Sequence, residues 1–227
     1  MIERVWSLWT GLTRASVEAP KPGEICVVVS PESLLCPPGW VGIVRIEGAT
    51  LATVPDDQMV DRVRLALGQS DPITALEPAE VVGPAWLSYL DPADFVPCGG
   101  DVERLPVGHP AVKDLIARVD QADADEAGLD GIASDAFVVR DADEVISASG
   151  YRPWLDTAAH LSVLTAPGGR GQGLARVVAS AAAADALDRG LVPQWRARVE
   201  PSRRVAGALG FREVGSQVRL RLPFEGD

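Results

Sequence analysis

Residues 165–175 read Thr-Ala-Pro-Gly-Gly-Arg-Gly-Gln-Gly-Leu-Ala, and this stretch decides how the chain is interpreted. A strand-like apolar run, 159–165, leads into it, and an alanine-rich run, 173–189, follows it and stops at Gly190. The stretch is therefore predicted to be a glycine-rich loop between a strand and a helix. Glycines let successive N–H groups point to one side, and the start of a helix leaves further N–H groups unpaired. Such a loop, with the positive charge of Arg170, should hold a pyrophosphate.

Three kinds of phosphate-binding loop compete for this stretch. A dinucleotide-binding loop needs glycines at i, i+2 and i+5, but the last place falls on Leu174 or Arg176. A nucleoside triphosphate loop needs Gly-Lys-Ser/Thr, which does not occur here. The third pattern, Arg-x-x-Gly-x-Gly/Ala, is matched in each specified place by Arg170, Gly173 and Ala175. This pattern resembles the signature of the GNAT (GCN5-related N-acetyltransferase) superfamily.

The resemblance covers about residues 101–222. The strand that leads into the loop and the helix that leaves it are similar to the central motif of the family. Further on, Ser-Arg-Arg-Val-Ala-Gly-Ala-Leu-Gly-Phe at 202–211 resembles its second motif. Residues 136–140 and 144–149, joined by a tight turn, are similar to its second and third strands.

Periodicity and turn signals predict a mixed α/β fold with long-range strand pairing. The resemblance implies the GNAT (acyl-CoA N-acyltransferase) fold, a mixed central sheet with flanking helices, in the C-terminal half, preceded by an α+β region. After residue 100 the expected strands are 102–105, 136–140, 144–149, 159–165, 192–198 and 211–222, and the expected helices are 109–119, 173–189 and 202–209, the last capped by Ser202. Before it we expect strands at 25–29 and 41–46 and a helix at 56–67. Pro-Cys-Gly-Gly at 97–100 predicts a domain boundary. Residues 1–100 would be an accessory region, with a degenerate GNAT-like fold as one interpretation, and residues 101–227 the GNAT domain.

What the resemblance implies is acetyl transfer from acetyl-CoA, as cosubstrate, to a primary amine, by direct attack in a ternary complex and without a metal. The backbone of Val163, Leu164 and Thr165 would pair with the pantetheine arm, and an N–H near Leu164 would polarise the thioester carbonyl. The diphosphate would be bound by residues of the loop and the start of the helix: Arg170, Gly171, Gln172, Gly173, Leu174 and Ala175. Ser202 is a further candidate for contact with the cofactor.

Two catalytic groups of the family are missing from their usual places. The second motif often carries an Asn and, seven residues later, a Tyr that acts as general acid; these places hold Val199 and Ala206. The usual base is a Glu on the strand before the loop, where this chain offers Asp156 and His160. His160 has a near-neutral intrinsic pKa and is the candidate catalytic residue, with a structural histidine as the alternative. A catalytically weak or silent acyl-CoA-binding regulatory module is therefore the alternative to an enzyme, and a nucleotide-binding protein is a second one.

Several other side chains allow two interpretations. Trp195 belongs either to the core or to the wall of a substrate cleft. Arg203 and Arg204 either reach the 3′-phosphate of coenzyme A or lie on the surface. The acidic residues Asp120, Asp123, Asp125, Glu126 and Asp130 lack the order of a calcium-binding loop and are expected to be a solvated face.

The composition narrows the class of partner. A formal net charge of -11 argues against general binding to nucleic acid or to an anionic membrane, and it slightly favours an amine-bearing small molecule as the acceptor. Eight arginines between 189 and 221 form a basic region that fits an anionic ligand. Three cysteines without a Cys-x-x-Cys pair predict neither a disulfide framework nor a zinc site. With no secretory signal recognised at the start, we expect a cytoplasmic protein, monomeric or homodimeric.

Overall fold

The computed structural model describes residues 1–223 and divides the chain into two compact units. Residues 88–212 form one unit, and residues 2–87 with the chain from Glu213 onward form the other. The boundaries between the units, at residues 87/88 and 212/213, differ from the boundary expected at residue 100. The reason is that the last strand, β10 (Arg212–Arg221), pairs antiparallel with β2 (Val41–Ile46) of the N-terminal region. The role of residues 1–100 stays a prediction.

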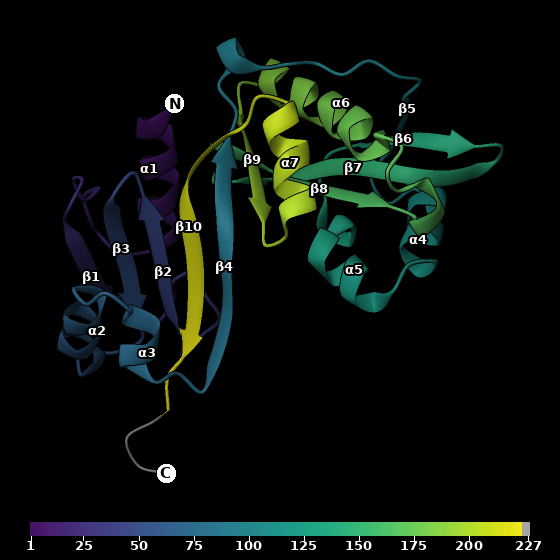
Figure 1. The fold of residues 1–227 in the computed structure, drawn as a ribbon. Coiled ribbons are helices and arrows are strands. Elements are labelled where there is room, and N and C mark those ends of the chain that lie inside the picture. The colour runs from purple at the N-terminus through teal and green to yellow at the C-terminus, as the bar shows by residue number, and fades with distance from the viewer. Residues whose placement is uncertain (224–227) are drawn as a thin grey trace. The chain divides into compact units, whose positions relative to one another are not determined.

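The unit of residues 88–212 is a sheet with helices on both of its faces (Figure 1). Its strands, in spatial order, are β9 (Val192–Ala197), β8 (Ala158–Thr165), β7 (Glu144–Trp154), β6 (Ala136–Asp141) and β5 (Glu103–Leu105). Its helices are α4 (Pro110–Ala117), α5 (Gln121–Ala127), α6 (Leu174–Asp188) and α7 (Glu200–Ala208), with short 3₁₀ turns at Pro92–Asp94, Leu129–Gly131 and Pro167–Gly169. The pairs β5/β6, β6/β7 and β7/β8 are antiparallel, whereas β8 and β9 are parallel. The predicted mixed α/β class is confirmed.

The alternation of side chains along the strands separates two apolar clusters in this unit. Phe137 and Leu161 pack against α6, which turns four fully buried alanines toward the sheet, namely Ala179, Ala182, Ala183 and Ala186. Val138 and Leu164, at alternate positions of the same two strands, point to the other face, where they pack with Leu115 of α4. Small alanine side chains let the backbone of α6 approach the strands closely, so the helix that follows the glycine-rich loop is fixed against the sheet.

The second unit is described by itself. Its strands, in spatial order, are β1 (Ile25–Val29), β3 (Ala49–Val54), β2, β10 and β4 (Glu80–Tyr89), and its helices are α1 (Ile2–Leu12), α2 (Met59–Leu67) and α3 (Pro72–Leu76). The pair β1/β3 is parallel and the pair β2/β3 is antiparallel. Val63, Ala66 and Leu67 of α2 pack with apolar residues of β1, β2 and β3 in one cluster.

The expected elements are present, with bounds that shift by a few residues, and β7 extends further than expected, to Trp154. Five elements were not predicted: α1, β3, α3, β4 and α5. The expected cap of α7 was wrong, because the helix begins at Glu200, Val199 is its N-cap, and Ser202 lies inside its first turn. Among residues 1–223, no helix is long and apolar enough to span a bilayer.

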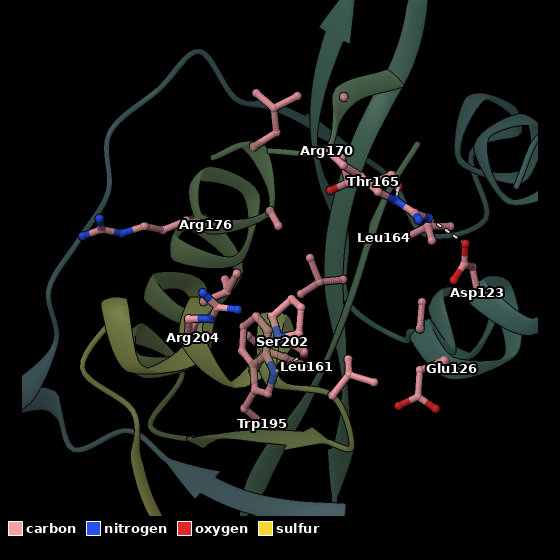
Figure 2. Close-up of a pocket in the computed structure, with 18 of the residues that line it drawn as sticks. Asp123, Glu126, Leu161, Leu164, Thr165, Arg170, Arg176, Trp195, Ser202 and Arg204 are labelled. Carbon is pink, nitrogen blue, oxygen red and sulfur yellow. Dashed lines mark hydrogen bonds and ion pairs between the residues drawn. The ribbon is translucent and has the colours of Figure 1, made fainter. Parts of the chain in front are cut away.

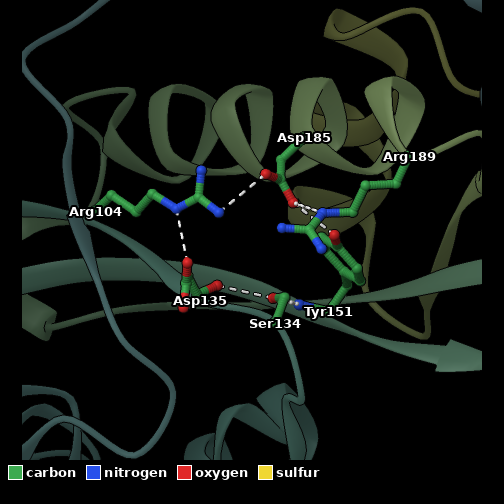
Figure 3. A network of polar contacts seen from close by, with 6 residues as sticks. All are labelled: Arg104, Ser134, Asp135, Tyr151, Asp185 and Arg189. Carbon is green, nitrogen blue, oxygen red and sulfur yellow. Dashed lines mark hydrogen bonds and ion pairs between the residues drawn. The ribbon is translucent and has the colours of Figure 1, made fainter.

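A network of polar side chains joins α6 to the sheet on the face shown in Figure 3. The Tyr151 hydroxyl donates to Asp185 (2.5 Å), which also accepts from Arg189 (2.9 Å) and lies 3.4 Å from Arg104. Arg104 in turn donates to Asp135 (2.7 Å). Burial alone would raise the pKa of the Asp185 carboxyl, but the hydrogen bonds from Tyr151 and Arg189 outweigh it and hold that pKa below its usual range.

This lowered pKa makes a prediction about stability and pH. A carboxyl whose pKa is lower in the folded state than in the unfolded state stabilises the fold above its unfolded pKa, and the contribution is lost as the pH falls through the folded value. Asp185→Asn should therefore lower the free energy of unfolding at pH 7, and the gap to the parent should narrow in acid. Urea unfolding of the variant and of the parent, at pH 7 and in acid, measures this gap in the free energy of unfolding. Asp188→Asn, at an exposed place on the same helix, is the control; a gap for Asp185→Asn that is the same at both pH values would contradict the prediction.

Candidate functional site

The central feature of the site is an opening between β8 and β9. The two strands pair only where Ala158–His160 lie opposite Val192–Gln194. Beyond His160 the strands are unpaired with each other, and a pocket of about 750 Å³ lies there, lined from β8 by Leu161, Val163, Leu164 and Thr165 and from β9 by Trp195 and Arg196. The loop after β8, the start of α6, and residues of α5 and α7 complete the wall (Figure 2).

The peptide groups of β8 alternate between the two neighbours of the strand. The N–H of Ala166, just after β8, donates to the carbonyl of Ile146 on β7 (2.8 Å). The carbonyl of Thr157, just before β8, accepts from the N–H of Val192 on β9 (3.0 Å). Because successive residues of a strand turn their peptide groups to opposite sides, even-numbered residues of β8 face β7 and odd-numbered residues face β9.

This alternation determines which peptide groups face the opening. The N–H and C=O groups of Val163 and Thr165 are turned toward the pocket, and the Thr165 carbonyl accepts from the Arg170 guanidinium across it (3.3 Å). Leu164 also lines the pocket, but its peptide group is turned toward β7. A strand edge with unpaired peptide groups can accept an extended ligand as an added strand.

The glycine-rich loop forms a second row of unpaired N–H groups. Gly171 (φ 76°) and Gly173 (φ 80°) adopt the left-handed conformation, and Gly173 is the N-cap of α6. Within residues 1–223, the backbone N–H groups of 171–175 have no hydrogen-bond partner. α6 has no acidic residue in its first turn, so its N-terminal partial charge is not offset there. The loop and the helix start together form an anion-binding site.

The charged side chains around the pocket are mostly basic. Four arginines line it, Arg170, Arg176, Arg196 and Arg204, against two carboxylates from α5, Asp123 and Glu126. Asp123 pairs with Arg170 (2.6 Å), and Glu126 pairs with Arg198. The Nε atom of Arg176 is buried and has no hydrogen-bond partner among the described residues. The pocket thus keeps more positive than negative charge, which suits a polyanionic ligand.

A strand that runs into this loop with peptide groups turned toward a pocket is the geometry that the sequence resemblance implies. Residues 136–217 match the model of the GNAT acetyltransferase family. The resemblance is confirmed over that part of the chain. A GNAT-family protein from Novosphingobium aromaticivorans has a similar structure, with a TM-score of 0.51 and 23% identity, covering 64% of this chain and 67% of the other. A GNAT-family acetyltransferase from Colwellia psychrerythraea has a TM-score of 0.52 and 13% identity, with 75% of each chain covered. These two likenesses support the fold, and a search of curated proteins finds no match.

Most residues predicted for the GNAT cofactor site are brought together in the pocket. They are Val163, Leu164, Thr165, Arg170, Gly171, Gly173, Leu174, Ala175 and Ser202. Gln172 does not line it with these, because its side chain turns back and donates to the Gly168 carbonyl (3.0 Å). Asp123 and Glu126 also line the pocket, although the sequence predicts them to lie on a solvated face. An acidic helix with no buried side chain has no pattern that marks it as part of a site.

Trp195 and Ser202 connect the core with the pocket. The indole N–H of Trp195 donates to the Ser202 hydroxyl oxygen (2.9 Å), and its ring packs edge-on against Phe211 with centroids 5.6 Å apart. Trp195 is 6% exposed and also lines the pocket, so both interpretations of this residue apply. Because the Ser202 oxygen accepts from the indole, its own hydrogen is available to donate. Of the two arginines considered for the 3′-phosphate, only Arg204 lines the pocket.

His160, the candidate GNAT base, lies where β8 and β9 are still paired and does not line the pocket. Its Nδ1 is 3.0 Å from the side-chain oxygen of Gln194, and its ring stacks on Trp154 with centroids 4.3 Å apart. Gln194 is fully buried and donates to the Tyr89 hydroxyl (2.6 Å). Burial lowers the pKa of His160 to about 3, so the imidazole is neutral at pH 7 and a weak base. The geometry favours the structural interpretation of His160.

The places of the usual GNAT Asn and of the Tyr acid offer no proton donor. Val199 lines the pocket, and Ala206 is buried in the core. The other weighed carboxyl, Asp156, lies in the turn between β7 and β8 with φ 49° and does not line the pocket. Among residues 1–223, no three His, Cys, Asp or Glu side chains gather closely enough to hold a metal ion.

Proposed function

We propose that the pocket binds acetyl-CoA and that the protein transfers the acetyl group to a primary amine of a small molecule. One observation carries the proposal: a strand edge without a partner strand beyond His160 leads directly into a loop whose N–H groups at 171–175 have no partner among residues 1–223. An extended chain that ends in a diphosphate has the shape and charge to bind to the strand edge and to the N–H groups of the loop. The negative charge of the whole protein supports a cationic amine as the acceptor.

In this proposal the residues present fit the cofactor part by part. The diphosphate lies on the N–H groups of the loop and near Arg170, at the N-terminus of α6. The pantetheine arm lies along β8, where the peptide groups of Val163 and Thr165 can pair with its amides. Arg204 lies on the wall formed by α7 and is the candidate contact of the 3′-phosphate.

The chemistry follows from these positions. The unprotonated amine attacks the thioester carbonyl carbon, the attacking nitrogen gives up one of its two protons, and the C–S bond breaks to leave the amide and a thiolate. The N–H of Val163 or Thr165 stabilises the negative charge that develops on the carbonyl oxygen. The leaving thiolate takes up one proton, and the Ser202 hydroxyl, held by Trp195, is placed to donate to it. Orientation of the two reactants would supply most of the rate enhancement.

A second candidate function is a silent or weakly active acyl-CoA-binding module. It is favoured by Val199 and Ala206 in the places of the usual polar groups, and by the low pKa of His160. Both candidates share the pocket and differ only in turnover.

The two functions are separated by measuring binding and turnover on the same sample. Isothermal titration with acetyl-CoA, with NAD and ATP as controls, tests the pocket, and release of coenzyme A with a panel of small primary amines tests catalysis. Binding of acetyl-CoA with turnover of at least one amine supports the transferase. Binding without turnover on any amine supports the module. Binding of NAD or ATP alone would overturn both.

A further inference from the structure

The Arg170 guanidinium, assigned above to the cofactor diphosphate, is already held by a carboxylate in this structure. Asp123 of α5 lies 2.6 Å from it, and both side chains line the pocket (Figure 2). The side chains of Arg170 and Asp123 are 49% and 41% exposed, so the pair is open to solvent and to an entering ligand. Asp123 occupies Nη2 of the guanidinium and the Thr165 carbonyl occupies its Nε, so a phosphate that takes this edge of the group competes with Asp123.

The fold does not need this contact for packing. α5 has no buried side chain, and the chain is anchored just after it, where Leu129 is buried and the Ser162 hydroxyl donates to the Gly128 carbonyl (3.1 Å). The two ion pairs, Asp123 with Arg170 and Glu126 with Arg198, join α5 to the loop and to the end of β9. A weakly packed helix held by exposed ion pairs is a segment that a ligand can displace.

We propose that Asp123 is a built-in competitor of the cofactor: its carboxylate holds the Arg170 guanidinium until the diphosphate replaces it. This inference rests on the proposed function, and it concerns the regulation of the same pocket. Two consequences follow. The intrinsic affinity for coenzyme A is set below what the loop alone would give, and the gain on replacing Asp123 depends on Arg170.

The test is the affinity for coenzyme A of Asp123→Asn, measured by isothermal titration. Asparagine keeps the shape and removes the charge, so the variant should bind coenzyme A about two- to fivefold more tightly, the size expected for an exposed ion pair. The matched control is Asp125→Asn, which removes the same charge from the same helix. Asp125 accepts a hydrogen bond from Gln121 (2.7 Å) and does not line the pocket. The affinity of Asp125→Asn for coenzyme A should therefore equal that of the parent.

A double-mutant cycle locates the effect. In an Arg170→Gln background, Asp123→Asn should leave the affinity for coenzyme A unchanged, because the contested group is gone. Weaker or unchanged binding by Asp123→Asn alone would overturn the inference and make Asp123 a positioning residue or a bystander. A gain that persists without Arg170 would overturn it too. Absence of coenzyme A binding by the parent protein is a different result, and it would remove the proposed function itself.

Discussion

Gly173→Asp should weaken binding of coenzyme A by about a hundredfold or more, because two effects act together on the diphosphate. Gly173 has φ 80°, a conformation that side chains other than Gly and Asn rarely adopt, and it caps α6 at the centre of the row of unpaired N–H groups. The added carboxylate would accept hydrogen bonds from those N–H groups and repel the phosphates. Isothermal titration with coenzyme A measures the loss.

Two controls divide this loss into strain and charge. Gly173→Asn has nearly the same shape as the aspartate and tolerates the left-handed conformation, so it isolates the charge. Gly168→Asp adds the same charge to the same loop at a place where a Cβ meets nothing within 4 Å and which does not line the pocket. We expect the order of affinity to be parent, Gly168→Asp, Gly173→Asn and then Gly173→Asp. Undiminished affinity in Gly173→Asp would end the assignment of the loop.

Gly210→Ala should destabilise the protein by about 3 kcal/mol or more, because a methyl group there has no room and an unsuitable backbone. Gly210 has φ 91°, and a Cβ on it would lie 1.9 Å from the carbonyl oxygen of Asp94. Both residues belong to the unit of residues 88–212. Relief requires the chain after α7 to move, which would disturb Phe211 and its contact with Trp195 in the pocket wall. Urea or thermal unfolding measures the change.

The control for Gly210→Ala is the same substitution three residues earlier. Gly207 lies within α7, has an ordinary φ, and would place its Cβ in open space. Gly207→Ala should therefore stabilise the protein by roughly 0.5–1 kcal/mol, since alanine favours the helix. We therefore expect the same Gly→Ala change to destabilise the protein at position 210 and to stabilise it at position 207. A mild effect at Gly210 would mean that the loop at Asp94 is free to move away.

The loop could be predicted from the sequence because its chemistry is local. Glycines at 171 and 173 between a strand and a helix lead to unpaired N–H groups wherever such a segment occurs. The pairing of β8 with β9 could not be predicted in the same way. Both strands have suitable patterns, yet nothing in either shows that they separate after His160, because separation depends on how each strand packs in the folded unit.

The role of His160 and the missed elements show two other limits. Its intrinsic pKa favours a base, and only burial beside Gln194 and Trp154 reverses that. The helix α1 carries a readable pattern, since Val5, Leu8, Trp9 and Leu12 recur at helical spacing and are all buried. In contrast, α5 has no apolar period at all, and its part in the pocket comes from charge pairs with distant residues.

The path of β10 has a practical consequence for anyone who wants to work with only the part of the chain that matches the family. The stretch that matches the family ends at residue 217, inside a strand whose partner, β2, comes from the first fifty residues. A shortened protein that starts at residue 101 would keep β10 and lose that partner. Its unsatisfied edge would then be open to pairing with other chains, so such a fragment should aggregate, and expression of the whole chain is the safer route.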